Sequence, residues 1–281
     1  MEVVIYLKNV LRKTDPDCVF LMETKGKKEK MERLCRKLGY FEFVIVEPSG
    51  LAGGLTMMWK KELDIQCLWK SNRVICCSFK PAPTEEAWNF YGCYGTPYPR
   101  EKEKFWKSLN HTIQEEYLPW VMFGDLNEVV AENEKLGGRS IWKRRLCLKN
   151  FLQEVDGIDL GFVGRKFTWE NKQQGIALIK ERLDRAVASR SWIHRFPQAV
   201  VEHLPLEESD HCPIVIKSEG ATKTSKHPFR FLQAWVSDAS SRQVVDSAWN
   251  MEVKGGMESH KILRRLNSTT KALREWNKHH F

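Results

Sequence analysis

The chain has 281 residues, of which 42% are hydrophobic, and it carries a formal net charge of +9 with a pI near 9.1. No apolar stretch approaches the roughly 18 residues of a membrane-spanning helix, so a role within a membrane is not expected. The length is enough for one large α/β domain with a sizeable core, alone or followed by a tail. The basic balance favours a polyanionic partner such as nucleic acid, although a solvated lysine-rich surface without a ligand would give the same composition.

The N-terminal residues show helical spacing, with Val3, Leu7, Val10 and Leu11 on one face, and they resemble neither a signal peptide nor an obvious transit peptide. The eight cysteines have no metal-binding spacing. We expect them to be small, reduced core residues of an intracellular protein.

Strand-like and helix-like segments are mixed along most of the chain, as in an α/β layer fold. Short apolar runs predict strands at residues 18–22, 41–46, 55–59, 74–79, 89–94, 121–124 and 213–216. Apolar residues at helical spacing predict helices over 27–38, 100–117 and about 146–155. The consecutive strands between residues 41 and 94 favour antiparallel pairing within a sheet.

The last part of the chain differs in composition. From Glu219 onward there are 11 lysines and arginines against 6 aspartates and glutamates, so +5 of the net charge lies in the final 63 residues. The polar segment 221–227 is a candidate linker, and a weak helical stripe follows it: Ile262, Leu266, Leu273 and Trp276. We therefore expect residues 1–217 to form one domain and residues 218–281 to form a basic tail of one or two helices that need a partner.

Three carboxylates stand beside predicted strands. Glu23 follows the run 18–22, Asp125 follows the run 121–124, and Asp210 stands with His211 just before the run 213–216. Side chains that are distant in sequence would then meet on one rim of a sheet. Hard oxygen ligands together with an imidazole are what a magnesium-dependent phosphoryl-transfer site requires.

Seven short motifs occur in an order that resembles the endonuclease/exonuclease/phosphatase superfamily. They are Glu23-Thr24-Lys25, Gly53-Gly54-Leu55, Tyr94-Gly95-Thr96-Pro97, Gly124-Asp125-Leu126-Asn127, Phe167-Thr168-Trp169, Arg182-Leu183-Asp184-Arg185 and Ser209-Asp210-His211. Each motif is weak alone, but the ordered set, over roughly residues 10–217, most resembles the apurinic-type endonuclease of plant LINE-type retrotransposons. The resemblance implies an α/β protein with a two-layer β-sandwich flanked by helices, the DNase I-like fold.

The resemblance also implies a role for each matching residue. Glu23 would hold a magnesium ion, with manganese as an alternative; Asp125 would orient or deprotonate the attacking water, and Asn127 would position the phosphate. Asp210 and His211 would form a hydrogen-bonded carboxylate and imidazole pair that stabilises a pentacovalent phosphorane. The other matches are a phosphate-contacting tyrosine and three supporting residues: Tyr94, Asp184, Thr168 and Ser209.

Each match also has a purely structural interpretation. Asp184 could pair with Arg182 or Arg185 on a solvated surface. The remaining matches could be ordinary turn, cap or strand residues: Tyr94, Asp125, Thr168 and Ser209. Three further histidines show no ligand spacing and are interpreted as surface or core residues: His111, His194 and His203.

One feature of the family has no match. Family members begin with a strand that ends in Trp-Asn and supplies an asparagine to the metal site, but the 22 residues before Glu23 contain no Trp-Asn, and Asn9 lies in the helical stretch. We therefore expect the first strand to be missing, as in a truncated element, a mis-predicted gene start or a fragment. The loss of a central strand would expose ladder hydrogen bonds and core surface.

Three functions are compatible with these motifs. The resemblance favours magnesium-dependent hydrolysis of DNA that nicks one strand, in the nucleus if the substrate is genomic DNA. The alternatives are a non-catalytic remnant with weak nucleic-acid binding and a phosphatase of inositol phosphates or other phosphoesters. The tail resembles the segment that joins the endonuclease to a reverse transcriptase, which this sequence does not contain; no obligate protein partner is indicated.

Overall fold

The computed structural model describes residues 2–50, 53–115, 117–140, 146–207, 209–219, 235, 238–251 and 258–280. Its contacts divide the chain into two compact units, Met1–Ser225 and Lys226–Phe281. The candidate linker at 221–227 lies outside the described residues. Within the described ranges, no helix is both long enough and apolar enough to cross a membrane.

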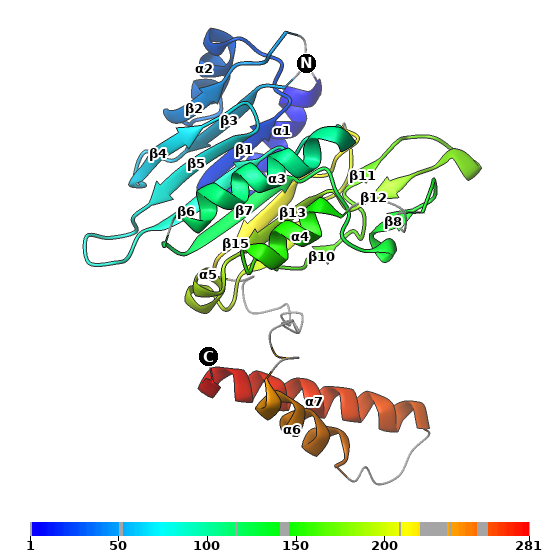
Figure 1. Cartoon of the computed structure of the whole chain (residues 1–281). Coiled ribbons are helices and arrows are strands. Elements are labelled where there is room, and N and C mark those ends of the chain that lie inside the picture. The colour runs from blue at the N-terminus through cyan, green and yellow to red at the C-terminus, as the bar shows by residue number, and fades with distance from the viewer. Residues whose placement is uncertain are drawn as a thin grey trace. The chain divides into compact units, whose positions relative to one another are not determined.

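A six-stranded sheet forms one layer of the first unit (Figure 1). Its strands, in spatial order, are β4 (Ile65–Lys70), β5 (Val74–Phe79), β6 (Trp88–Cys93), β7 (Trp120–Asp125), β13 (Asp184–Ala188) and β9 (Ile158–Asp159). Neighbouring strands are antiparallel except for β6 and β7, which run parallel. A parallel pair requires a crossover connection, and helix α3 (Pro99–Gln114) supplies it.

Two three-stranded sheets form the facing layer. One has the order β1 (Cys18–Met22), β3 (Leu55–Trp59), β2 (Glu42–Val46), and the other has the order β10 (Val163–Gly164), β14 (Val200–His203), β15 (Ile214–Lys217). Inward side chains of both layers share one core, including Leu55, Phe90 and Val201. Strands β1 and β15 each lie at the edge of their sheet, and Glu2–Thr14 forms helix α1.

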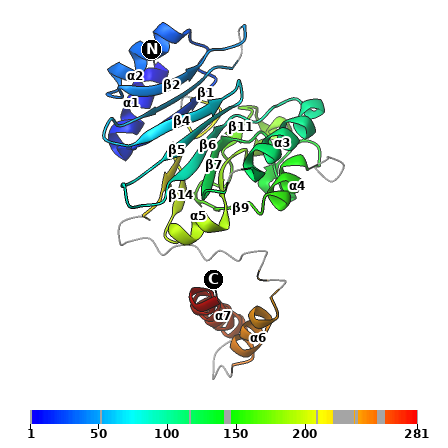
Figure 2. The ribbon, with the colours of Figure 1, turned by 60° about the vertical axis from the view of Figure 1, so that its left-hand side comes forward.

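Helices cover the outer faces of the two layers (Figures 1 and 2). Pro99 begins α3 with a ring that is pre-set for a first helical turn, and its apolar stripe buries Trp106 and Leu109 beside Phe151 of α4 (Cys147–Glu154). Helix α2 (Lys28–Lys37) buries Cys35 against Met58 of β3. A short helix, α5 (Arg190–Arg195), follows β13.

A third small sheet lies in the loops that follow β7. It consists of β11 (Trp169–Glu170), β12 (Lys180–Glu181) and β8 (Lys135–Leu136), in that order. An isolated bridge joins Trp169 to His211. This sheet therefore connects two of the sequence motifs that the resemblance rests on.

The predicted strands and helices are confirmed, with their ends shifted by a few residues. Strand β4 was not predicted, because its side chains alternate between half-buried and exposed, with Leu68 outward, and so give no apolar run. The two-residue strands were also not predicted, since a strand of that length has no periodicity to detect.

Among its described residues, the second unit has two helices, α6 (Ala239–Trp249) and α7 (Glu258–His280). Asp238 caps α6 by accepting a hydrogen bond from the Ser240 amide. The two helices pack against each other around a small aromatic core that contains Trp235, Leu273 and Trp276. The rings of Trp235 and Trp276 meet edge to face with their centroids 5.6 Å apart.

Candidate active site

Asp125 and Asp184 lie side by side on two central strands. Asp125 is the last residue of β7 and Asp184 is the first residue of β13, and the antiparallel register pairs them directly. Both are almost fully buried, with 4% and 3% of their surfaces exposed. Gly124 precedes Asp125 with a φ of +134°, and a β-carbon there would collide with the carbonyl oxygen of Cys93. Two carboxylates that are distant in the sequence thus meet in the sheet.

His211 lies against both carboxylates. Its Nδ1 is 2.8 Å from Oδ2 of Asp184, and its Nε2 is 3.9 Å from Oδ2 of Asp125. The carboxylate partner of His211 is therefore Asp184, and the predicted pairing of Asp210 with His211 is wrong. Asp210 lies in the bend just before His211, and its carboxylate bonds to other partners. The alternative that Asp184 pairs with arginines on a solvated surface is also wrong, because Asp184 is buried.

Asp210 is instead held by Trp169 and Ser209. The indole Nε1 of Trp169 donates to Oδ2 of Asp210 at 3.1 Å, and the Ser209 hydroxyl donates to Oδ1 at 3.4 Å. The Ser209 oxygen also accepts a hydrogen bond from the His211 amide at 3.1 Å. Ser209 thus fixes the turn that carries both Asp210 and His211.

Thr168 joins the His211 segment to strand β13. Its hydroxyl oxygen accepts hydrogen bonds from the amides of Leu183 and Asp184, both at 2.9 Å. Its carbonyl oxygen accepts a hydrogen bond from the Cys212 amide at 2.8 Å. This nearly inaccessible threonine therefore connects the backbone next to Asp184 with the backbone next to His211.

Asn127 holds the carboxylate of Asp125. Its amide nitrogen and its Nδ2 donate to the two oxygens of Asp125, each at 2.8 Å, and Nδ2 also donates to the carbonyl of Gly95 at 2.9 Å. Asn127 has a φ of +54°, a left-handed conformation that asparagine adopts more readily than most residues. The ammonium of Lys102 on α3 donates to the Asn127 carbonyl, which fixes this loop from the other side.

Glu23 and Tyr94 form a second polar pair near Asp125. The Tyr94 hydroxyl donates to Oε1 of Glu23, and Lys25 Nζ lies 3.5 Å from Oε2. Glu23 has a φ of +50°, an unfavourable conformation for a glutamate and one that is found disproportionately at functional sites. The Asp125 amide lies 3.3 Å from the sulfur of Met22, so the end of β1 adjoins the end of β7.

The surroundings shift the pKa values of several groups in the site, among them Asp125, His211 and Tyr94. Burial, and then the charge of Asp184, raise the pKa of Asp125 above the usual range of a carboxyl group. Burial alone would lower the pKa of His211, but the hydrogen-bonded Asp184 raises it to about 9. Burial and the hydrogen bond to Glu23 raise the pKa of Tyr94. At neutral pH His211 is therefore an imidazolium, while Asp125 is suited to accept a proton.

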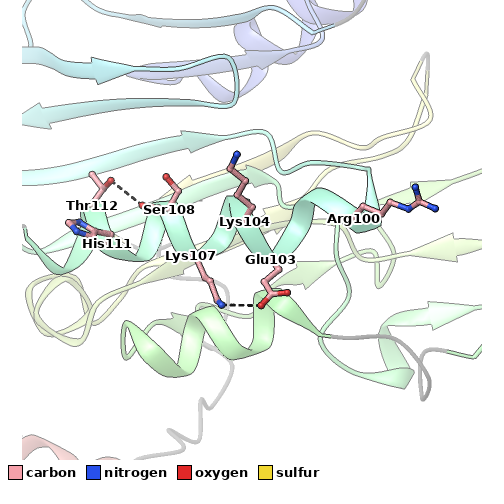
Figure 3. Close-up of a pocket in the computed structure, with 7 residues that line it drawn as sticks. All are labelled: Arg100, Glu103, Lys104, Lys107, Ser108, His111 and Thr112. Atoms are coloured by element: carbon pink, nitrogen blue, oxygen red, sulfur yellow. Dashed lines mark hydrogen bonds and ion pairs between the residues drawn. The ribbon is translucent and has the colours of Figure 1, made fainter.

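A hollow of about 700 Å³ opens beside this group. It is lined by Met22, Glu23, Lys25, Trp169, Glu170, Asn171, Lys172, Ser209 and Asp210. Another hollow, of about 650 Å³, lies on the outer face of α3 and is lined by Arg100, Glu103, Lys104, Lys107, Ser108, His111 and Thr112 (Figure 3). None of the predicted site residues lines the hollow on α3, where Lys107 pairs with Glu103 at 3.0 Å. The hollow beside Glu23 and Asp210 is therefore the candidate substrate site.

The donor set of the site fits a hard divalent cation. Asp125 and Asp184 each present a carboxylate oxygen, and these atoms and a ring nitrogen of His211 lie within 4.8 Å of one another. Glu23 and Asp210 add carboxylates at the hollow. Carboxylate oxygens are the ligands that magnesium and related cations prefer. The predicted requirement for a metal thus has suitable residues in place.

Three residues support the site in ways that the sequence did not predict. Trp169 belongs to a quoted motif, but its contact with Asp210 could not be seen there. Lys102 and Arg185 contact the loop after Asp125 through its carbonyl groups. Lysines and arginines are common in this chain, so their number and spacing carry no signal for such contacts.

A family model shows where the chain belongs. The model described as "Endonuclease/Exonuclease/phosphatase family" matches residues 3–238. The chain is a member of this family. Family members are divalent-metal-dependent nucleases and phosphatases, in agreement with the donor set of the site. None of the curated proteins matches the chain.

Solved structures of the endonuclease/exonuclease/phosphatase fold are similar to the first unit. The AP endonuclease LMAP from Leishmania major is 19% identical with a TM-score of 0.60, over 74% of this chain and 80% of that one. The 3'-5' exonuclease NExo from Neisseria meningitidis is 17% identical with a TM-score of 0.59, over 76% and 93%. The endonuclease domain of TRAS1, a telomere-specific non-LTR retrotransposon, is 13% identical with a TM-score of 0.53, over 76% and 90%. At these identities the likeness shows the DNase I-like fold.

Proposed function

We propose that this chain is a metal-dependent endonuclease that hydrolyses DNA phosphodiesters and nicks one strand. The observation that carries the proposal is the geometry of His211, which is held by Asp184 and faces Asp125 beside a hollow rimmed by Glu23 and Asp210. A buried carboxylate with a raised pKa next to an imidazolium provides a proton acceptor and a positive charge within one site.

The chain's own residues suggest how the reaction would proceed. A water that lies against Asp125 gives a proton to that carboxylate while its oxygen attacks the phosphorus, and the opposite P–O bond breaks. Asn127 keeps the carboxylate oriented through its two hydrogen bonds. The His211 imidazolium stabilises the negative charge that builds up on the phosphoryl oxygens. A magnesium or manganese ion held by Glu23 and neighbouring carboxylates would neutralise charge on the scissile phosphate.

Two features support DNA as the substrate. The chain carries a net charge of +9, which favours a polyanion over a small neutral ligand. The similar solved structures include an AP endonuclease and a Neisseria 3' phosphatase bound to a product DNA hairpin.

By extension, and from the ordered motifs, we propose a LINE-type retrotransposon of a plant as the origin of the chain, with genomic DNA in the nucleus as its target. The basic second unit would then have packed on a reverse transcriptase.

Nicking of a supercoiled plasmid tests the proposal. The purified chain is incubated with magnesium beside its Asp125→Asn variant, and EDTA serves as the metal control. A matched variant, Asp156→Asn, removes an exposed aspartate that pairs with Arg190 outside the site. We expect nicking that requires both metal and Asp125, with a loss of about 1,000-fold or more in Asp125→Asn and little change in Asp156→Asn.

Other outcomes would contradict the endonuclease proposal. A folded sample that binds DNA in a salt-dependent manner without nicking would indicate a catalytically inactive remnant. Turnover of a soluble inositol phosphate without DNA cleavage would indicate a phosphatase that uses the same residues.

A further inference from the structure

Four charged side chains form one cluster around the start of strand β13: Arg182 and Arg185 are buried, whereas Glu134 and Asp159 are partly exposed. Arg182 donates to Glu134 at 2.8 Å and to both oxygens of Asp159 at 2.8 and 2.7 Å. Arg185 donates to the two oxygens of Glu134 at 3.2 and 2.9 Å and to Asp159 at 2.9 Å. The two positive and two negative charges balance, which compensates for the cost of removing them from water. We refer to these four residues as the charge cluster.

Each carboxylate of the charge cluster is also anchored to the backbone. The Val130 amide donates to Glu134 at 2.8 Å, and the Gly161 amide donates to Asp159 at 2.8 Å. Burial would raise the pKa of Asp159, but the two guanidinium groups lower it to about 2. Both acids are therefore ionised at neutral pH and present fixed negative charge to the arginines.

Arg185 makes two contacts that Arg182 does not share among the described residues. Its Nη2 donates to the carbonyl oxygen of Glu128 at 3.1 Å and to the carbonyl oxygen of Arg182 at 2.8 Å. Glu128 directly follows Asn127, and Arg182 lies two residues before Asp184. One guanidinium thus bridges the loop that orients Asp125 and the backbone that begins strand β13.

We propose that Arg185 is a positioning residue for the active site, which fixes the Asn127 loop relative to Asp184. This inference rests on the proposed function, since it assigns Arg185 a role in that same site. Arg185 touches no group that would react; it acts through two backbone carbonyls. Its side chain is fully buried, and loss of the guanidinium donors would leave several acceptors without these hydrogen bonds.

A lysine at this position would not be equivalent. The planar guanidinium presents several N–H groups in a fixed fork, and Arg185 uses them on two carboxylates and two carbonyls at once. A lysine has the same charge but a single nitrogen, which cannot reach all four acceptors. Arg185→Lys should therefore keep the charge balance and lose part of the geometry.

The alternative is that the charge cluster supports only the fold. In that case substitution of Arg182 and substitution of Arg185 would have the same effect, because each variant loses one positive charge from the same cluster. Arg182→Met is therefore the matched control: it unbalances the charge in the same way but leaves both carbonyl contacts of Arg185 in place. Ile113→Ala, in the buried face of α3, provides a second control for a loss of stability elsewhere.

The experiment compares local order with activity. Hydrogen exchange of backbone amides is followed by NMR in the full chain with EDTA, at Asn127, Leu183 and Asp184, whose amides bond to Asp125 or Thr168. We expect exchange at these amides to be about tenfold or more faster in Arg185→Met than in Arg182→Met, with Arg185→Lys between them. Nicking by Arg185→Met should lose about tenfold in kcat, with KM within about twofold of wild type.

The possible results separate this inference from the proposed function. Equal exchange in Arg182→Met and Arg185→Met would overturn the positioning role, whatever the activity. If Arg185→Met does not fold, Arg185→Lys decides: exchange at the wild-type rate in that variant would also overturn the role. A wild-type chain whose amides exchange slowly at these positions but which never nicks DNA would refute the proposal that the chain is an endonuclease. The comparison of exchange rates between the variants would still decide whether Arg185 orders the loop.

Discussion

Replacing Asp184 by asparagine should remove the positive charge of His211 at neutral pH. The Nδ1 of His211 lies 2.8 Å from Oδ2 of Asp184, and both side chains lie largely out of contact with water. The substitution keeps the shape of the side chain and removes its negative charge. Asp210→Asn is the matched control, because Asp210 is the neighbour of His211 in sequence but is bonded to Trp169.

The size of the effect follows from the environment of the imidazole. Burial lowers the pKa of His211, and Asp184 more than reverses this and brings the pKa to about 9. Without the Asp184 charge the pKa should fall by at least about 2 units, a change of ~3 kcal/mol, while the smaller effects of Asp125 and Asp210 remain. At pH 7.5 the protonated fraction would drop from ~97% to less than ~25%.

NMR titration of the imidazole protons measures this pKa directly. The samples contain EDTA, and His211→Gln assigns the signal. We expect a fall of at least about 2 pKa units in Asp184→Asn and of less than about 0.5 in Asp210→Asn. A His211 pKa in Asp184→Asn within about half a unit of wild type would refute the reasoning, and so would an equal fall in both variants. Magnesium-dependent nicking should fall with the protonated fraction in Asp184→Asn.

Three further predictions concern stability. Burial would raise the pKa of Asp159, but Arg182 and Arg185 lower it to about 2. The ionised carboxylate therefore stabilises the fold above its ordinary pKa near 4, and this contribution is lost as the pH falls towards 2. The free energy of unfolding in urea should fall by ~2 kcal/mol over this range in the wild type but not in Asp159→Asn. Gly124→Ala forces a β-carbon against the carbonyl of Cys93 and should cost about 3 kcal/mol; an unchanged melting temperature would contradict the close approach of β6 and β7. Trp276→Ala removes a ring from the core of the second unit and should lower the unfolding midpoint of α6 and α7. Plasmid nicking should stay at the wild-type rate. If nicking is lost as well, the two units do not act independently.

Much of the fold could be predicted because the core strands are continuous apolar runs. Strand β3 is buried along its whole length, and the runs that become β5 and β7 are nearly so. Strand β4 was missed for the opposite reason, since it lies at the edge of the sheet and alternates between half-buried and exposed side chains. The short strands around the site pair over only two residues each, which is too short to leave a pattern in the sequence.

The sequence named the carboxylates and the histidine that the structure brings together, but it gave neither their pairing nor the supporting contacts of Trp169, Lys102 and Arg185. Local order in the chain placed Asp210 beside His211, whereas the sheet register places Asp184 opposite Asp125 and brings His211 to it. Local apolar runs and motif order were enough to show which carboxylates and which histidine stand at strand ends. They could not show which carboxylate bonds to the imidazole or which arginine supports the loop. Those contacts join residues that are distant in sequence, and they depend on strand register and on the direction in which each side chain points.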